Sequence, residues 1–258
     1  MIRTCAALLG ILVGLTAPTL AADCPRQDTL GTARVLEVSA ATTPRVGIRS
    51  FPETLPLADK EVVLTFDDGP AATTSKVLAA LQRECVRATF FLVGTGTASM
   101  PQLVRRMAAE GHSIGHHTWS HRNLKQLTFA AAVEEIDRGI AAEEAALNGK
   151  ASAVPSTPFF RFPFFESTPE LLDLLQSRGI VVFGADLWAS DWNPMTPQEQ
   201  LTLITGRLER AGKGIILFHD PRAQTAAMIP DFLRWLRENH FRVVHVVAKR
   251  SELKPQTH

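Results

Sequence analysis

The sequence predicts an α/β protein, a distorted and incomplete (β/α) barrel of about seven parallel strands. Short apolar runs rich in β-branched and aromatic residues alternate with amphipathic helical stretches, a rhythm typical of parallel βαβ units. Ionisable residues follow five of the seven runs, and a barrel gathers the carboxyl ends of its strands around one mouth. The length of 258 residues is close to the roughly 250 residues of a single barrel.

The seven expected strands are short apolar runs bounded by polar or turn residues, as in strands that are covered on both faces. They occupy residues 61–66, 88–93, 112–116, 159–162, 180–185, 214–218 and 241–246. Six helices are expected between them, with proline at the first position of three and glycine just past the end of three. They occupy residues 74–84, 101–110, 129–147, 169–178, 197–211 and 225–239.

Residues 1–22 have the features of a secretory signal peptide. Arg3 precedes an apolar run over residues 5–15, and small residues allow cleavage after Ala22 or Ala21. The run is shorter than the ~20 residues that a membrane span needs, which disfavours the alternative of an uncleaved anchor. We expect a periplasmic or secreted protein with no membrane attachment after cleavage.

The three cysteines are interpreted in that oxidising compartment. Cys5 leaves with the signal peptide, so that Cys24 and Cys85 remain. We expect a Cys24–Cys85 disulfide that ties the N-terminal extension to the end of the first helix, with a contribution of about 4 kcal/mol in the chain-entropy model. The alternative is a pair of buried free thiols.

The charge balance excludes partners that bind through a strong electrostatic field. Lys plus Arg number 27 and Asp plus Glu number 26, a net charge of +1. That balance supplies no field for nucleic acid or for an anionic membrane.

His117 and His121 are four residues apart, a spacing that on a helical turn points both imidazoles to one side. With Asp68 as the third ligand they would complete a catalytic zinc shell that keeps one position open. The alternative is a pair of ordinary surface or core histidines.

Asp67 and Asp68 are adjacent carboxylates at a strand end, which repel one another unless a cation or an arginine neutralises them. If Asp68 binds a metal, Asp67 is free to act as a base. A solvated Asp-Asp-Gly turn is the alternative.

Five motifs together carry a family resemblance. They lie at residues 65–70, 117–121, 161–164, 191–192 and 217–219. In this order they resemble the polysaccharide deacetylases with the NodB homology domain, carbohydrate esterase family 4. The resemblance implies a distorted (β/α) barrel over residues 61–250, preceded by an extension over residues 23–60 for which we expect little regular structure.

The resemblance also implies roles for the first three motifs. Asp67 would be the general base, and Asp68, His117 and His121 would hold a divalent metal, usually zinc. Arg161 would pair with Asp67 and fix its direction.

The last two motifs imply the general acid. His219 would protonate the departing amine, and Asp191 would hold and tune its imidazole. Asp186 is a rival of Asp191 for that partnership.

The pocket walls follow from the same resemblance. The backbone N–H of Phe164, which stands where many relatives have tyrosine, would stabilise an oxyanion. Trp192 and Leu217 would shape the apolar slot for an acetyl methyl group. Trp119 and Trp188 flank motif loops and would either stack on sugars or pack as a lid.

Other polar residues receive structural interpretations. We expect His116 to support the metal site or the fold, and His112, His240 and His245 to be packing or surface histidines. The glutamates within residues 134–144 are expected on a solvated helix face.

The implied reaction is metal-assisted removal of N-acetyl groups from an N-acetylglucosamine-containing polysaccharide, with release of acetate. O-deacetylation, as in acetylxylan esterases, and a non-catalytic glycan-binding barrel remain alternatives. The acetylated polysaccharide itself is left open.

Overall fold

The computed structural model describes residues 28–249, and within these residues ten strands run parallel in one sheet. They are β1 (Thr32–Val38), β2 (Arg45–Val46), β3 (Glu61–Asp67), β4 (Thr89–Leu92), β5 (Ser113–His116), β6 (Phe159–Phe160), β7 (Val181–Phe183), β8 (Leu187–Trp188), β9 (Gly214–His219) and β10 (Arg242–Ala248). All seven expected strands are present, and β1, β2 and β8 are additional.

The sheet is curved but open. Its order is β1-β10-β3-β4-β5-β6-β7-β2, and a branch runs from β3 through β9 to β8. Within residues 28–249 no pairing joins the end strand β2 to β8, where a closed barrel would need it. The prediction of a distorted, incomplete barrel is therefore confirmed, with ten strands in place of about seven.

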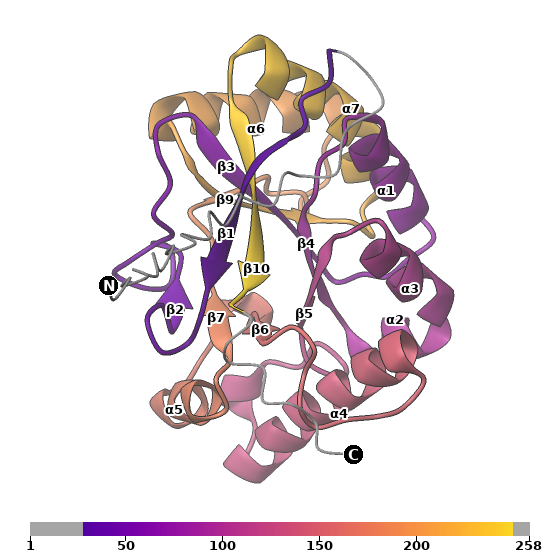
Figure 1. The fold of residues 1–258 in the computed structure, drawn as a ribbon, viewed down its shortest axis with the longest axis vertical. Helices are drawn as coiled ribbons and strands as arrows, with labels where there is room; N and C mark the ends of the chain where they lie inside the picture. The colour runs from indigo at the N-terminus through magenta and orange to yellow at the C-terminus, as the bar shows by residue number, and fades with distance from the viewer. Residues whose placement is uncertain (1–27, 250–258) are drawn as a thin grey trace, which may run out of the picture.

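The helices cover the outside of this sheet. They are α1 (Thr74–Arg83), α2 (Gly94–Ser99), α3 (Pro101–Ala109), α4 (Phe129–Asn148), α5 (Pro169–Ser177), α6 (Pro197–Ala211) and α7 (Ala223–Glu238), with 3-10 turns η1 (Leu124–Gln126) and η2 (Pro163–Phe165). Figure 1 shows α1, α3 and α4 along one side of the sheet and α6 with α7 across one end. The six expected helices are confirmed, whereas α2 lacks the apolar period that would reveal it.

The N-terminal extension contains more regular structure than we expected. β1 pairs with β10 from Thr32 opposite Val243 to Val38 opposite Ala248, so that the first and last strands lie side by side (Figure 1). Most side chains of β1 are only half-buried, which explains why its sequence lacks the apolar run of a central strand. The expected signal peptide, residues 1–22, and Cys24 lie outside the described residues.

Two layers of apolar side chains position the strands. Inside the barrel, one cluster includes a buried residue from each of five strands, Val63, Phe91, Phe159, Phe183 and Ile215. Outside, the ring of Phe66 on β3 stacks between Phe90 and Phe218 at centroid distances of 5.0 and 5.5 Å. With apolar contacts on both faces, the strands hold the loops at their carboxyl ends in fixed places.

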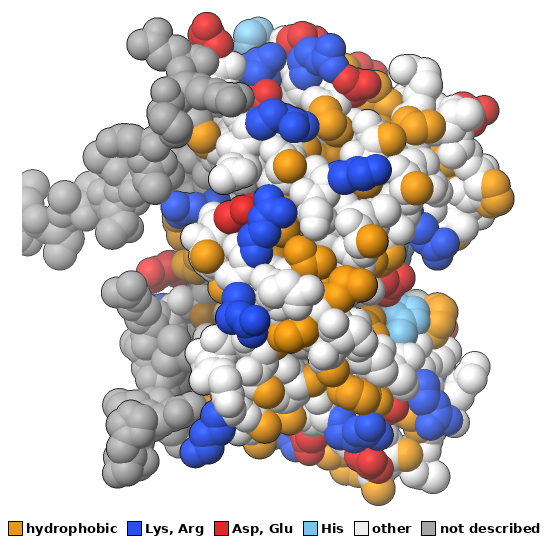
Figure 2. Space-filling model, turned by 90° about the vertical axis from the view of Figure 1, so that its right-hand side faces the viewer, with side chains coloured by type: hydrophobic (Ala, Val, Ile, Leu, Met, Phe, Trp, Pro, Cys, Tyr) orange, Lys and Arg blue, Asp and Glu red, His pale blue; other side chains and the backbone are white. Residues whose placement is uncertain are grey.

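The surface carries mixed charge. On the face over α1 and α3, Figure 2 shows Lys and Arg side chains interspersed with acidic, polar and apolar ones, without a continuous basic strip. Between residues 28 and 249, no helix combines the length and the apolar character needed to cross a bilayer.

Candidate active site and metal centre

The sheet brings four of the five sequence motifs to one end. Asp67 is the last residue of β3 and lies in register with His219, the last residue of β9. His117 directly follows β5, and Arg161 directly follows β6. Because parallel strands end at the same edge, these polar side chains meet.

Asp68, His117 and His121 form one cluster of potential metal ligands, with one ligand atom from each lying within 4.8 Å of the others. Asp68 Oδ1 is 3.5 Å from His117 Nε2 and 3.2 Å from His121 Nε2. This oxygen is buried and has no hydrogen-bond partner among residues 28–249. His117 donates from Nδ1 to the carbonyl oxygen of Arg161 (2.7 Å), which directs its Nε2 towards Asp68. Two imidazole nitrogens and an unpartnered carboxylate oxygen fit a divalent cation such as zinc.

The loop between the two histidines differs from the helical turn that their spacing suggested. Thr118 and His121 have φ angles of +70° and +57°, and residues 117–121 form an irregular loop. The backbone N–H of His121 donates to Thr118 Oγ1 (3.0 Å). The histidines therefore converge through a strained loop, and such backbone must be held by its surroundings.

Helix α4 holds this loop. Trp119 N–H donates to the carbonyl of Glu135, and the Ser120 N–H and Oγ donate to the Glu135 carboxylate, each at 2.9 Å. A Cβ on Gly139 would lie 2.7 Å from the carbonyl carbon of Thr118, so that only glycine permits this approach. The interpretation of the α4 glutamates as solvated was wrong for Glu135, Glu143 and Glu144, which are buried. The error arose because the partners of Glu135 and Glu143, Ser120 and His116, lie outside the helix and 15 and 27 residues away.

His116 and Glu143 are bonded to each other beneath the loop, and both are fully enclosed. His116 Nε2 contacts the carbonyl oxygen of Thr157 (3.2 Å), and burial lowers the pKa of His116 to about 4. This environment agrees with a structural role for His116.

Arg161 is fully buried and directs Asp67. Its Nη1 donates to Asp67 Oδ1 (2.7 Å) and to Thr65 Oγ1 (2.9 Å), while Nη2 donates to the carbonyl of Gly184 (2.7 Å). Burial raises the pKa of the Asp67 carboxyl above its usual range, against the opposing charge and hydrogen bond of Arg161. One oxygen of Asp67 is thus committed to Arg161, and Oδ2 lies 3.8 Å from His117 Nε2.

His219 is paired with Asp191. Its Nδ1 lies 2.7 Å from Asp191 Oδ1, its backbone N–H donates to Oδ2 (2.7 Å), and Thr225 Oγ1 donates to the same oxygen (2.7 Å). Burial by itself lowers the pKa of His219, but Asp191 and the carboxylates of Asp67 and Asp68 raise it to about 9.

The rival acid Asp186 lies elsewhere. Its carboxylate accepts from the backbone of Ile48 and Ile215 and from Thr54 Oγ1, and so joins the N-terminal segment to β9. Of the two aspartates, Asp191 is the one in contact with His219.

The expected pocket residues surround these groups. The Trp192 ring, with the residue 45% exposed, lies 5.9 Å from the His219 imidazole. Phe164, 61% exposed, has a φ of +59° and packs edge-on at 4.8 Å against His121. Leu217 is buried on β9, and the ring of Trp119 lies under the guanidinium of Arg138 (4.5 Å).

Two residues that sequence reasoning missed complete the supports, Thr225 and the buried Asp220. Asp220 accepts a hydrogen bond from Thr74, and burial raises its pKa to about 7. A Cβ on Gly69 would overlap its carboxylate, so Asp220 packs directly against the segment after Asp68. Neither residue has a local signal, because Asp220 is 146 residues from its partner Thr74 and Thr225 is 34 residues from its partner Asp191.

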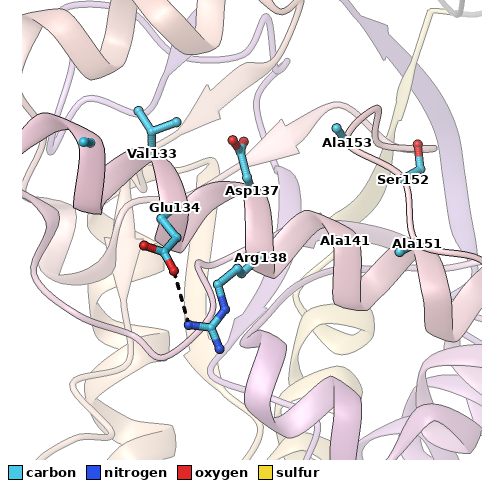
Figure 3. Close-up of a pocket in the computed structure, with 9 residues that line it drawn as sticks. Val133, Glu134, Asp137, Arg138, Ala141, Ala151, Ser152 and Ala153 are labelled. Carbon is cyan, nitrogen blue, oxygen red and sulfur yellow. Dashed lines mark ion pairs between the residues drawn. The ribbon is translucent and has the colours of Figure 1, made fainter.

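A separate groove of about 550 Å³ lies between α4 and residues 151–153 (Figure 3). Its polar side chains are Asp137, Ser152 and the exposed Glu134–Arg138 ion pair at 3.7 Å. It contains neither the metal-ligand cluster nor the paired histidine, so we assign the chemistry to the carboxyl end of the sheet.

The chain is similar to known deacetylases. A chitin deacetylase from Pestalotiopsis sp is 35% identical over 170 residues, 64% of this chain and 55% of that protein. A peptidoglycan-N-acetylglucosamine deacetylase from Bacillus cereus is 31% identical over 194 residues, 70% of this chain and 67% of that protein. The solved structure of a Bdellovibrio bacteriovorus peptidoglycan deacetylase has a TM-score of 0.75 at 29% identity, and the match covers 89% of this chain and 62% of that chain.

The chain thus spans just over half of the length of the first of these relatives and about two thirds of the other two. The family model for polysaccharide deacetylase matches residues 55–183, which is half of the 258 residues. With the fold and the motif geometry described above, this match shows that the chain belongs to the polysaccharide deacetylase family.

Proposed function

We propose that the protein is a metal-dependent hydrolase that removes N-acetyl groups from an N-acetylglucosamine-containing polysaccharide and releases acetate. The observation that carries this proposal is the Asp68, His117 and His121 cluster beside two separate proton-handling pairs, Asp67 with Arg161 and His219 with Asp191. The names of the relatives, chitin and peptidoglycan deacetylases, support the same chemistry.

Asp68, His117 and His121 would hold the cation, and zinc suits their two nitrogens and one oxygen. A bound divalent cation supplies positive charge that polarises the carbonyl of an acetamide. The hydrogen bond from His117 Nδ1 to the Arg161 carbonyl fixes the ring for this purpose.

Asp67 acts as the general base. Its Oδ1 is held by Arg161, so Oδ2 is the oxygen that takes a proton from the attacking water. The raised pKa of Asp67 makes it a better proton acceptor than an exposed aspartate.

His219 acts as the general acid. Asp191 binds its Nδ1, which leaves Nε2 facing the pocket, 3.9 Å from Asp68 Oδ2. Its raised pKa keeps the imidazole protonated near neutrality, so Nε2 can give a proton to the departing nitrogen. An amine cannot leave without that proton, whereas an ester depends on it less, so a protonated acid at this place suits amide cleavage.

The remaining pocket residues orient the acetyl group. The N–H of Phe164 donates to the oxygen of the tetrahedral intermediate, and Trp192 with Leu217 encloses the methyl group. Because the donor is the main-chain N–H, a phenylalanine side chain suffices at this position.

The protein acts in the periplasm or outside the cell. Residues 1–22 resemble a signal peptide, and the Bacillus cereus relative is named for a cell-wall substrate. A Cys24–Cys85 disulfide accompanies that location, because exported proteins meet an oxidising environment. It would attach the N-terminal extension just past Glu84, the C-cap of α1. Peptide mass mapping of the exported protein with and without reductant tests both the cleavage site and the disulfide.

The test of the reaction combines metal analysis with acetate release from chitooligosaccharide, peptidoglycan and acetylxylan. We expect one equivalent of bound metal and acetate release from the amide substrates. Asp67→Asn should lower turnover by about 10²–10⁴-fold and keep the metal. Full activity after exhaustive chelation would overturn metal dependence, and loss of both metal and activity in Asp67→Asn would make Asp67 a ligand.

A further inference from the structure

An aromatic row runs from the catalytic pocket across the neighbouring surface. The ring of Trp192, next to His219, lies 6.1 Å from the ring of Trp188. Trp188 in turn stacks on Phe165 at 6.4 Å. The half-exposed ring of Trp192 is the end of this row nearest the reaction, and such a ring face suits the apolar face of a sugar.

Arg49 lies on this row. Its guanidinium is 4.8 Å from the centroid of the Trp188 ring, and its Nε donates to the carbonyl of Asp186 (3.3 Å). Within residues 28–249 its two terminal nitrogens have no hydrogen-bond partner, and no carboxylate lies within 4 Å of them. The side chain is thus anchored on an aromatic face while the ends of its fork are free, the arrangement that binds carboxylates.

The backbone holds Arg49 in place. Its N–H donates to the carbonyl of Ala185 (3.0 Å), and Ile48 N–H donates to Asp186 Oδ1 (2.9 Å). Gly47 has a φ of +109°, and a Cβ there would lie 2.6 Å from the backbone of Gly184 and Ala185. The turn that carries Arg49 is therefore fastened to the strand end after β7.

A second arginine adds to the positive charge. Arg207 donates to the carbonyl of Trp188 and to Ser190 Oγ at 2.5 and 2.8 Å, and no carboxylate within residues 28–249 lies within 4 Å of it. Burial first, and then the neighbouring charges of Arg49 and Arg210, lower its pKa. Arg49 and Arg207 thus give this surface a positive charge that no carboxylate within residues 28–249 pairs with, which suits an anionic ligand.

We infer that Arg49, supported by Trp188, forms a subsite for a carboxylate on the sugar next to the one that is deacetylated, while Trp192 contacts the sugar ring. This inference rests on the proposed function and narrows its substrate class. The preferred polymer alternates N-acetylated aminosugars with sugars that bear a carboxylate, in place of a neutral polymer. It also assigns a role in substrate recognition to the N-terminal extension.

The test compares two tetrasaccharides of equal length, neutral chitotetraose and peptide-free alternating N-acetylglucosamine and N-acetylmuramic acid. Arg49→Gln should raise KM for the anionic tetrasaccharide about tenfold with kcat unchanged, a change of about 1.4 kcal/mol, and should leave chitotetraose unaffected. Arg49→Lys should retain part of the preference. Arg83→Gln, on the exposed last turn of α1, removes the same charge at the other end of the strands and should change neither substrate.

A third arm uses the anionic tetrasaccharide with its sugar carboxylates joined to stem peptides. An Arg49-dependent preference that disappears there identifies the carboxylate of the sugar, which is the source that we infer. A preference that persists there shows that Arg49 also takes a carboxylate of the peptide, which overturns the restriction to the sugar carboxylate.

The contrary outcomes are distinct. Wild-type protein that prefers chitotetraose, or Arg49→Gln that raises KM equally for both tetrasaccharides, overturns the subsite. If wild-type protein releases acetate from neither tetrasaccharide, the proposed function fails. Calorimetric binding of the two tetrasaccharides then tests the Arg49 subsite independently of turnover. Tighter binding of the anionic sugar that is lost in Arg49→Gln supports it, and equal binding overturns it.

Discussion

Two regions of the sheet contain buried or largely buried histidines and use them in opposite ways. At the carboxyl end, His219 lies against the carboxylate of Asp191 and its pKa rises to about 9. Between β5 and β10, His245 contacts Ser113 Oγ (3.0 Å), and His112 Nδ1 accepts from the N–H of Ala88 (3.1 Å).

The pKa of the second pair moves in the other direction. Burial lowers the pKa of His245 to about 4 and also lowers that of His112, against the hydrogen bond and charge of nearby Glu110. In this comparison burial lowers the pKa of His245 and His112, whereas at His219 the combined effect of Asp191, Asp67 and Asp68 outweighs burial. The carboxyl end can therefore move protons. His112 and His245, called the inner pair below, serve packing, as we expected.

The largest expected effect comes from removing the charged imidazole. His219→Gln should lower kcat on chitooligosaccharide by about 10²–10⁴-fold, because the amine then leaves without its proton. Acetylxylan should suffer less, since an alkoxide depends less on protonation. Steady-state kinetics on both substrates measure the ratio, and His245→Gln is the control that should change kcat little. Equal losses on the two substrates would contradict the assignment of His219.

His245 of the inner pair should make the free energy of unfolding depend on pH. An unfolded histidine titrates near pH 6.5, and His245 in the fold titrates near pH 4. Between these values the unfolded chain binds the extra proton, so stability should fall with decreasing pH by up to about 3 kcal/mol. In His245→Gln this slope should be shallower at every pH between 6.5 and 4, as measured by urea unfolding. An unchanged slope would show that His245 does not titrate differently on unfolding.

A smaller effect tests how α4 holds the metal loop. Glu135→Gln should weaken metal binding about 10–100-fold, because the amide replaces the carboxylate that accepts from Ser120. Competition with a chromogenic chelator measures this affinity without turnover. Its neighbour Glu134 is exposed and pairs with Arg138, so Glu134→Gln is the matched control. Equal metal affinities in Glu135→Gln and Glu134→Gln would show that the Glu135 carboxylate of α4 does not support the metal site.

The smallest effect concerns the hydroxyl of the inner region. Ser113 Oγ donates to the carbonyl of Val246 (2.7 Å) and accepts from His245. Ser113→Ala should lower the free energy of unfolding by about 1–3 kcal/mol, because it leaves buried polar groups unpaired. Its kcat and metal content should equal those of the wild type. If Ser113→Ala folded fully but lost deacetylase activity, the inner pair would be coupled to the carboxyl end of the sheet, contrary to the comparison.

The fold was largely predictable because its signals are local. Seven apolar runs and six amphipathic stretches matched strands and helices, since burial on both faces of a parallel strand leaves a continuous apolar run. β1 escaped because its side chains are half-buried and its pairing partner is about 200 residues away. The two residues of β8 are too short to show a period.

The sequence predicted which residues form the candidate site, but not the backbone conformation or the contacts that position them. The spacing of His117 and His121 indicated that both bind one metal ion. It also predicted a helical turn, which was wrong, because Glu135 and Gly139 on helix α4 shape an irregular loop. The supports from Thr225 and Asp220 are tertiary contacts without a sequence pattern. Arg49 belongs to a segment without a motif or an apolar period in the sequence. Its position became visible only in the structure, where its turn is hydrogen-bonded to the backbone after β7.

The pairing of β1 with β10 has a consequence for the order of assembly. Thr32 must find Val243, so this edge of the sheet joins residues from the two ends of the described chain. Contacts of such long sequence separation form slowly, because a large loop must close first. Val38 and Val244 from this edge complete the inner apolar cluster. A growing chain therefore cannot seal its core until its final strand has been synthesised.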